Sequence, residues 1–209
     1  MYTALGTRPD LAFIVQHLNQ FTISHGQDHW TAVKHALCYL KSTHDAGIVF
    51  KKDANMELEL YVDSDFANRA DTLSIGRYVA MLGGGYIAWS SKKQRTISLS
   101  TIEYIALTEG AKQLIWLCHA LLELGFNQNH PTSICSDNLG AITLSHDATY
   151  YAQMKHINVA HHFIHEKVAS NKAALTYIRS KENTVDIMTK GLKLHQHKYL
   201  CEKLRMETP

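Results

Sequence analysis

The clearest pattern of hydrophobic and polar positions lies at residues 56–63, where the two kinds of side chain alternate strictly. Alternation with a period of two is typical of a strand that buries one face. Two further apolar runs, 78–82 and 86–90, flank the three glycines at 83–85, which indicates a hairpin. Together the three runs predict three adjacent antiparallel strands.

Helical periodicity covers much of the chain that follows. The longest helix is predicted from about residue 101 to 124, where Gly125 closes it. Two short apolar runs, 133–137 and 174–178, predict further strands. The remaining predicted helices begin at Asn138, cover about 155–169, and begin at about Thr184. This order predicts an α/β fold in which helical crossovers add two parallel strands to the antiparallel ones, giving a mixed five-stranded sheet flanked by helices.

Residues 1–54 are predicted to form a small, separate helical segment. Pro9 can open a first helix, and a second helix carries an apolar stripe at helical spacing. That stripe consists of Trp30, Val33, Leu37 and Leu40. Since roughly 50 residues bury little core alone, this segment is expected either to pack on the α/β domain at 55–209 or to expose a former interface.

Length and composition limit the possible classes. With 209 residues the chain can bury one substantial core and carry a smaller appendage. No apolar run approaches the roughly 18 residues of a membrane helix, and the N-terminus has no signal-peptide pattern, so we expect no membrane partner. The four scattered cysteines are typical of a reducing compartment and predict an intracellular protein, cytoplasmic or nuclear. The formal charge of +2 does not by itself indicate nucleic-acid binding, and we expect no small-molecule cofactor.

The fourteen histidines are an excess that calls for an interpretation. His161 and His165 share one face of a predicted helix at a spacing that can hold a metal ion. The alternative is a solvated helix side with its imidazoles toward water. Glu166 lies about 100° round the helix from His165, and no cysteine is close in sequence, which favours the solvated side.

Four acidic residues stand at the ends of predicted elements. Asp63 ends the first long strand on its polar face, and Asp137 ends the strand at 133–137. Glu103 opens the long helix, and Asp186 lies in the first turn of the last predicted helix. Sites in open α/β sheets form outside the carboxyl ends of the central strands, so we expect the four acids to meet in one pocket.

Four carboxylates without basic partners would repel one another unless cations neutralise them. Mg²⁺ or Mn²⁺ prefers such oxygen ligands, and two ions about 4 Å apart can activate a water and stabilise the leaving oxygen of a phosphodiester. Each acid also has a structural explanation. Residues 100–103 and 183–186 fit capping boxes, Asp137 can assist a helix start, and Asp63 can be a solubilising strand end.

Six short motifs follow one another along the chain. They are Tyr61-Val62-Asp63-Ser64-Asp65-Phe66-Ala67, Leu82-Gly83-Gly84-Gly85 with Ile87-Ala88-Trp89-Ser90-Ser91-Lys92-Lys93-Gln94, Glu103-Tyr104-Ile105-Ala106-Leu107, Ser136-Asp137-Asn138, Lys155-His156-Ile157, and Val185-Asp186-Ile187-Met188-Thr189-Lys190. In this order they resemble the C-terminal part of a copia-type retrotransposon Pol polyprotein over nearly the full chain. Upstream, Thr7-Arg8-Pro9-Asp10 and His29-Trp30 resemble the segment that links the reverse transcriptase to ribonuclease H (RNase H) in that family.

The resemblance implies an RNase H-like fold at 55–209, a remnant of the reverse transcriptase thumb or connection at 1–54, and hydrolysis of the RNA strand of RNA–DNA hybrids. Asp63 then resembles the acid that bridges two Mg²⁺ ions. Glu103 and Asp137 resemble ligands of one ion, and Asp186 resembles the ligand of the other, beside the attacking water. Products would carry 3′-hydroxyl and 5′-phosphate ends. The implied partners are the hybrid, whose 2′-hydroxyl marks the RNA strand, and a polymerase domain.

Contacts to the nucleic acid are expected at two places. Lys92, Lys93 and Arg95 follow the hairpin, where cations can meet backbone phosphates, although a solubilising strand end explains them equally. Asn138, directly after Asp137, is a candidate for contact with the minor groove of the hybrid.

Two departures from the family keep a second hypothesis open. The approach to Glu103 is about two residues shorter than in relatives, and two residues correspond to about 200° of helix rotation. No Tyr-x-Asp-Asp tetrapeptide occurs, so DNA synthesis by this chain is not expected. The alternative is therefore a catalytically impaired retroelement relic that acts as a nucleic-acid-binding or structural module. A third interpretation, an integrase or resolvase of the same fold, lacks the context of the hairpin glycines.

Overall fold

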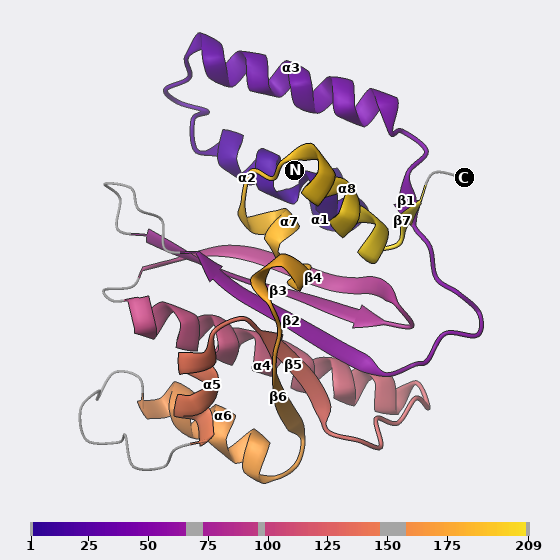
Figure 1. Cartoon of the computed structure of the whole chain (residues 1–209), viewed down its shortest axis with the longest axis vertical. Coiled ribbons are helices and arrows are strands. Elements are labelled where there is room, and N and C mark those ends of the chain that lie inside the picture. The colour runs from indigo at the N-terminus through magenta and orange to yellow at the C-terminus, as the bar shows by residue number, and fades with distance from the viewer. Residues whose placement is uncertain (1, 66–72, 96–98, 147–157, 208–209) are drawn as a thin grey trace.

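The computed structural model describes residues 2–65, 73–95, 99–146 and 158–207. Beside the gaps some side chains also lie outside the description, among them those of 91–95 and 99–103. Figure 1 shows one central sheet with helices on both of its faces.

The five strands of the sheet follow the order β4-β3-β2-β5-β6. Its first three members pair antiparallel, whereas β5 and β6 extend the sheet as parallel strands beside β2. The strands are β2 (Leu58–Asp65), β3 (Leu73–Leu82), β4 (Gly85–Arg95), β5 (Thr132–Ser136) and β6 (Ala173–Tyr177). Order and directions confirm the predicted RNase H-like mixed sheet.

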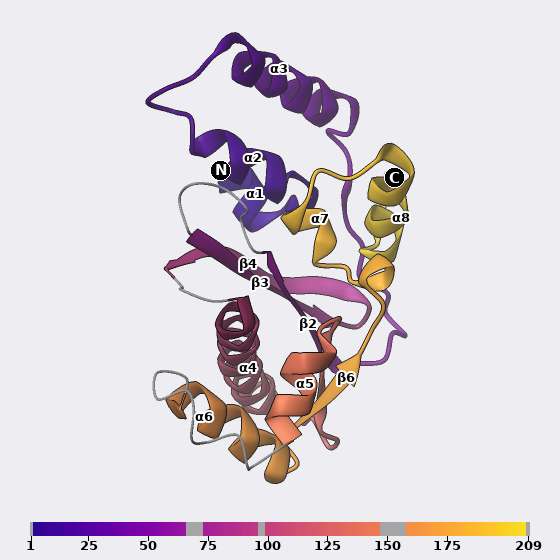
Figure 2. The ribbon, with the colours of Figure 1, turned by 60° about the vertical axis from the view of Figure 1, so that its left-hand side comes forward.

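The helices form two layers (Figures 1 and 2). One face of the sheet carries α4 (Leu99–Glu123), α5 (Leu139–His146) and α6 (Asn158–Ala169). The opposite face carries elements from both ends of the chain, which turning the molecule by 60° keeps on the same side. They are α1 (Tyr2–Gly6), the 3-10 turn η1 (Pro9–Leu11), α2 (Ala12–Asn19), α3 (Gln27–Ser42), the 3-10 turn η3 (Ser180–Glu182), α7 (Asp186–Thr189) and α8 (Leu194–Lys203).

The alternation along β2 sorts its side chains between the two faces. Leu58, Leu60 and Val62 are buried in the core beneath α4, as their period of two predicts. Helix α4 approaches β2 closely at Gly110, where a Cβ atom would stand 2.8 Å from Val62 Cγ2. The opposite face of β2 carries Asp63 toward the layer that contains α7.

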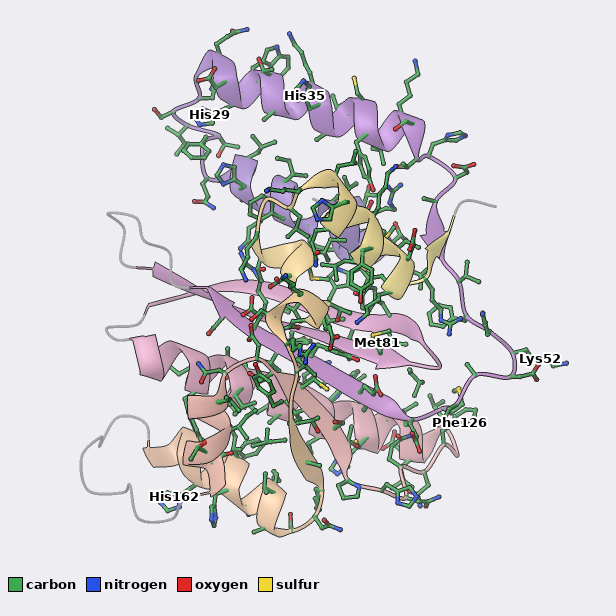
Figure 3. The ribbon with its side chains drawn as sticks, viewed as in Figure 1. His29, His35, Lys52, Met81, Phe126 and His162 are labelled. Carbon is green, nitrogen blue, oxygen red and sulfur yellow. The ribbon has the colours of Figure 1, made fainter. Side chains whose placement is uncertain are left out.

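A second core joins the N-terminal and C-terminal segments. It contains Ala12 from α2, Met81 from β3 (labelled in Figure 3), and Leu200 from α8. Strand β1 (Gly47–Ile48) pairs antiparallel with β7 (Met206–Glu207), so the two ends of the chain also share a small sheet. Residues 1–54 therefore pack on the rest of the protein, which is one of the two arrangements expected for this segment.

The structure departs from the sequence-based expectations at two helices. The helix that begins near 184 was expected to be the last, but α8 and β7 follow it. Helix α8 is mostly polar and buries only Leu200. It therefore has no apolar stripe from which the sequence could predict it. The stripe on α3 exists but buries no residue, and Trp30 and Leu37 are more than half exposed. Among the described helices none is long and apolar enough to cross a membrane.

Candidate functional site

Two of the four predicted acids meet at the carboxyl ends of neighbouring parallel strands. Asp63 lies near the end of β2, and Asp137 directly follows the last residue of β5. The parallel register pairs Val62 with Ser136, which brings the two aspartates to the same edge of the sheet. This is the place where ligands bind in open α/β sheets.

The third acid, Asp186, is the first residue of α7 and is tied to β2 through Asn183. The Asn183 side-chain amide donates a hydrogen bond to the carbonyl oxygen of Val62 at 3.2 Å, and its Oδ1 accepts one from the backbone of Val185. The N-cap of α7 is Val185, so Asp186 is the first helical residue and not the third, which the expected capping box at 183–186 requires. The Asp186 carboxylate instead accepts hydrogen bonds from Thr189 Oγ1 and Lys190 Nζ.

A pocket of about 220 Å³ lies between these elements. Its walls combine two of the acids with hydroxyl, amide and ammonium groups. They are formed by Val62, Asp63, Ser64, Ser136, Asp137, Asn138 and Lys190. An oxygen-rich pocket of this kind suits a hard cation or a phosphate held through a cation.

The surroundings of Asp63 change the pKa of its carboxyl group. Burial, reinforced by the negative charges of Asp137 and Asp186, raises its pKa to about 6, although the positive charges of Lys190 and Arg77 oppose the rise. Its Oδ2 atom is buried and has no hydrogen-bond partner among the described residues. A buried carboxylate oxygen with unused acceptor capacity is a site where a cation would be stabilised.

Lys190 brings a positive charge among the carboxylates. Its Nζ lies 2.9 Å from Asp186 Oδ1, and the side chain of Asp186 is only 9% exposed. Burial lowers the pKa of Lys190, but the hydrogen bond to Asp186 and the charges of Asp63, Asp186 and Asp137 raise it by more. The ammonium therefore stays charged at neutral pH.

Arg77 is a second cation that the sequence reasoning missed. It lies on β3 directly opposite Asp63 in the antiparallel register and is only 3% exposed. The expectation of acids without basic partners was therefore wrong, since Arg77 and Lys190 both favour the ionised form of Asp63. For Lys190 a signal existed, because it stands four residues after Asp186 at helical spacing. For Arg77 no signal existed before the register of β2 and β3 was known.

Asn138 has a structural role beside the pocket. Its Oδ1 accepts a hydrogen bond from the backbone N–H of Ala141 at 2.8 Å, which caps the start of α5. The Ser136 hydroxyl accepts a bond from the Asn138 backbone N–H and steadies the same turn. Only the side-chain NH₂ group of Asn138 is then left to contact a ligand in the pocket.

The other predicted site residues are placed only through their backbone. Glu103 lies in α4, which begins at Leu99 and thus about two residues before the predicted start. Lys92, Lys93 and Arg95 lie in the last part of β4, paired with β3. The side chains of all four are outside the description, so their contacts stay predictions.

The histidines and the acids are the side chains from which a metal site could be built. Within the described side chains, no three of His, Cys, Asp and Glu are grouped closely enough to hold a metal ion. Figure 3 shows His162 on α6, across the sheet from His29 and His35 on α3. The side chain of His161 lies outside the description, so the expected spacing with His165 stays a prediction.

Sequence similarity to Pol polyproteins of plant transposons shows the family of the chain. It is 37% identical over 189 residues, or 89% of its length, to the "Retrovirus-related Pol polyprotein from transposon RE2" of Arabidopsis thaliana. Over 207 residues, or 98% of its length, it is 38% identical to the "Retrovirus-related Pol polyprotein from transposon TNT 1-94" of Nicotiana tabacum. The chain belongs to the copia-type retrotransposon Pol polyproteins.

This copia-type chain spans 13% and 15% of the lengths of those two relatives. No protein-family model matches it. A solved structure with a similar arrangement is "LC11-RNase H1 in complex with RNA/DNA hybrid", which is 14% identical with a TM-score of 0.46. That similarity covers 61% of this chain and 88% of the LC11 chain.

Proposed function

We propose that this copia-type chain is an RNase H-type endonuclease that hydrolyses the RNA strand of RNA–DNA hybrids with two Mg²⁺ ions. The observation that carries the proposal is the convergence of Asp63, Asp137 and Asp186, from three separate elements, on one polar region. Burial raises the pKa of Asp63, and the charges of Asp137 and Asp186 add to the rise, so both of these acids lie within electrostatic range of Asp63. We further propose that 55–209 is the nuclease domain and 1–54 a remnant of the polymerase.

The donor set supports divalent ions as the missing partner. The three described side chains offer only carboxylate oxygens, and Asp63 Oδ2 is buried without a hydrogen-bond partner in the described part of the chain. Hard cations such as Mg²⁺ or Mn²⁺ prefer such ligands. Glu103 would complete the set from α4. When bound, such ions would activate a water and stabilise the leaving oxygen.

The protein's own groups have distinct tasks in this proposal. Asp63 is buried and fixed within β2, so it would hold its ligand oxygens in place without reorganisation. Asn183 ties α7 to the carbonyl of Val62 and would keep Asp186 at a constant position relative to β2. Asn138, Lys92, Lys93 and Arg95 would bind the nucleic acid, the asparagine through its free NH₂ group and the cations through phosphates.

Cleavage of an end-labelled RNA–DNA hybrid by the full chain in Mg²⁺ tests the proposal. We expect cleavage of the RNA strand, no cleavage of double-stranded DNA, and loss of cleavage in Asp63→Asn. The exposed Asp53→Asn is the matched control and should cleave like the wild type. No hybrid cleavage at high protein concentration with Mn²⁺ would reject the nuclease.

A specific observation favours a second candidate, a catalytically impaired relic that binds hybrids or acts as a structural module. The Lys190 ammonium neutralises Asp186, one of the acids that a metal ion would need as a ligand. Such a module would bind the hybrid equally in Mg²⁺ and in EDTA and would cut it in neither. An electrophoretic mobility shift beside the cleavage assay separates the two candidates.

A further inference from the structure

Lys190 forms an ion pair with Asp186, the described acid beside the pocket. Its Nζ donates to Asp186 Oδ1 at 2.9 Å. The carboxylate is nearly buried at 9% exposure, whereas the lysine side chain is 44% exposed. The same lysine borders the pocket that Asp63 and Asp137 line. One protein cation therefore contacts the acid that a metal ion would need as a ligand.

A carboxylate oxygen paired with an ammonium is a poorer ligand for a divalent ion. The ion would need the same oxygen, and the two positive charges repel each other at contact distance. We propose that Lys190 is an internal competitor of the metal, which pairs with Asp186 in the metal-free protein and is displaced when a divalent cation binds. The inference rests on the proposed function only in taking Asp186 as a metal ligand.

The local structure allows the lysine to leave without moving the carboxylate. Helix α7 ends at Thr189, and Lys190 follows it in extended backbone conformation, with its backbone N–H donating to the Asp186 carbonyl oxygen. Asp186 keeps its contact with Thr189 Oγ1 at 3.4 Å and remains fixed as the first residue of α7. The ammonium moves on a flexible stem, whereas the acid stays in position.

Space for the displaced side chain lies on the other side of Lys190. A second cavity of about 560 Å³ lies between the N-terminal helices and the segment that links α7 to α8. Lys190 borders this cavity as well as the pocket, together with Asp10, Phe13 and His197. The side chain can thus turn away from Asp186 toward open space, and its partial exposure keeps the cost of that movement low.

Isothermal titration of the full chain with MgCl₂ measures the competition directly. Lys190→Gln removes the competing charge, and we expect Mg²⁺ to bind about tenfold more tightly, which corresponds to about 1.4 kcal/mol. Lys190→Arg keeps a cation and should bind like the wild type or more weakly. Lys193→Gln removes an exposed charge nearby for which no ion pair is recorded among the described residues, so its affinity should change by less than about twofold.

Thermal unfolding supplies an independent readout of the same competition. Without metal, Lys190→Gln should melt cooperatively, which shows that it folds. A tighter-binding ion stabilises the native state more, so the rise in Tm on adding Mg²⁺ should exceed that of the wild type. An unchanged or weaker Mg²⁺ affinity in Lys190→Gln overturns the inference, and so does the absence of Mg²⁺ binding to both proteins.

The failures of this inference and of the proposed function give different results. If the wild type binds Mg²⁺ and cleaves hybrid but Lys190→Gln binds no more tightly, only the competition is refuted. If Lys190→Gln gains affinity while neither protein cleaves hybrid, the competition holds and the nuclease is refuted.

Discussion

The buried pair Arg8–Asp10 allows a quantitative test of how the N-terminal segment is attached. The guanidinium donates to both carboxylate oxygens, and the two side chains are only 5% and 0% exposed. Arg8 also donates to the Thr43 carbonyl and hydroxyl, and Tyr39 donates its hydroxyl to Asp10. The network joins η1 to the C-terminal end of α3, and η1 in turn contacts α7, which begins at Asp186.

Asp10→Ala leaves the Arg8 charge and the Tyr39 hydroxyl without their acceptor in a buried site. Breaking a buried pair by removing one partner costs about 3–5 kcal/mol. For a chain of this size each kcal/mol shifts Tm by about 2–4 °C, so we expect Tm to fall by about 6–20 °C. Differential scanning calorimetry of the full chain measures the shift. The exposed Asp53→Ala should stay within about 0.5 kcal/mol of the wild type.

The double variant Arg8→Met with Asp10→Leu separates charge burial from packing. Replacing both members of a buried pair by apolar residues is often neutral, so the double variant should be more stable than Asp10→Ala. A loss of under about 1 kcal/mol in Asp10→Ala, or a double variant less stable than the single one, would refute the reasoning.

Three further predictions concern the pocket and the core. The pKa of Asp63 is about 6 in the folded protein and 3.8 ordinarily, so its carboxyl group stabilises the fold fully below about pH 4. That contribution is lost as the pH rises through about 6. We therefore expect the free energy of unfolding of metal-free Asp63→Asn, measured in a urea titration at pH 8, to exceed that of the wild type by about 3 kcal/mol. Gly110→Val should lower the free energy of unfolding by at least about 2 kcal/mol in the same titration, since its side chain would overlap Val62. At Gly6 an added Cβ meets no atom within 4 Å, so Gly6→Ala should not lower the free energy of unfolding in this way. Asn138→Ala removes the cap of α5 and should lower the free energy of unfolding by about 1 kcal/mol, whereas Asn138→Ser keeps the cap. If both variants bind the hybrid more weakly than the wild type, the Asn138 amide contacts the hybrid.

Much of the fold could be predicted from local patterns. The alternation at 56–63 identified β2 and its buried face because strand periodicity depends only on neighbouring residues. The three glycines identified the β3–β4 turn, where Gly83 and Gly84 adopt positive φ. Helix α8 was missed because it presents few apolar residues, and its burial of Leu200 depends on the N-terminal segment. The sequence indicated Arg8 and Asp10 only as part of a family motif, although their ion pair ties η1 to α3 within that segment.

The acids of the candidate site were predictable and the cation Arg77 was not, for a physical reason. Asp63, Asp137 and Asp186 each end or begin an element, so the order of elements alone brings them together. Arg77 faces Asp63 only because of the β2–β3 register, and a slip by one residue would turn Arg77 to the opposite face of the sheet. The glycine turn joins β3 to β4, so it does not fix the register between β2 and β3.

This difference changes the argument for metal. The sequence predicts four acids without basic partners, whose repulsion in one pocket only divalent ions would neutralise. Arg77 and Lys190 both lower the pKa of Asp63, so the protein itself supplies part of the neutralising charge. The metal-free site is then tolerable, and under the proposed function divalent ions would be needed for chemistry and not for folding. A copia-type chain built in this way would fold before it meets its metal, and Lys190 would determine how readily the ion enters.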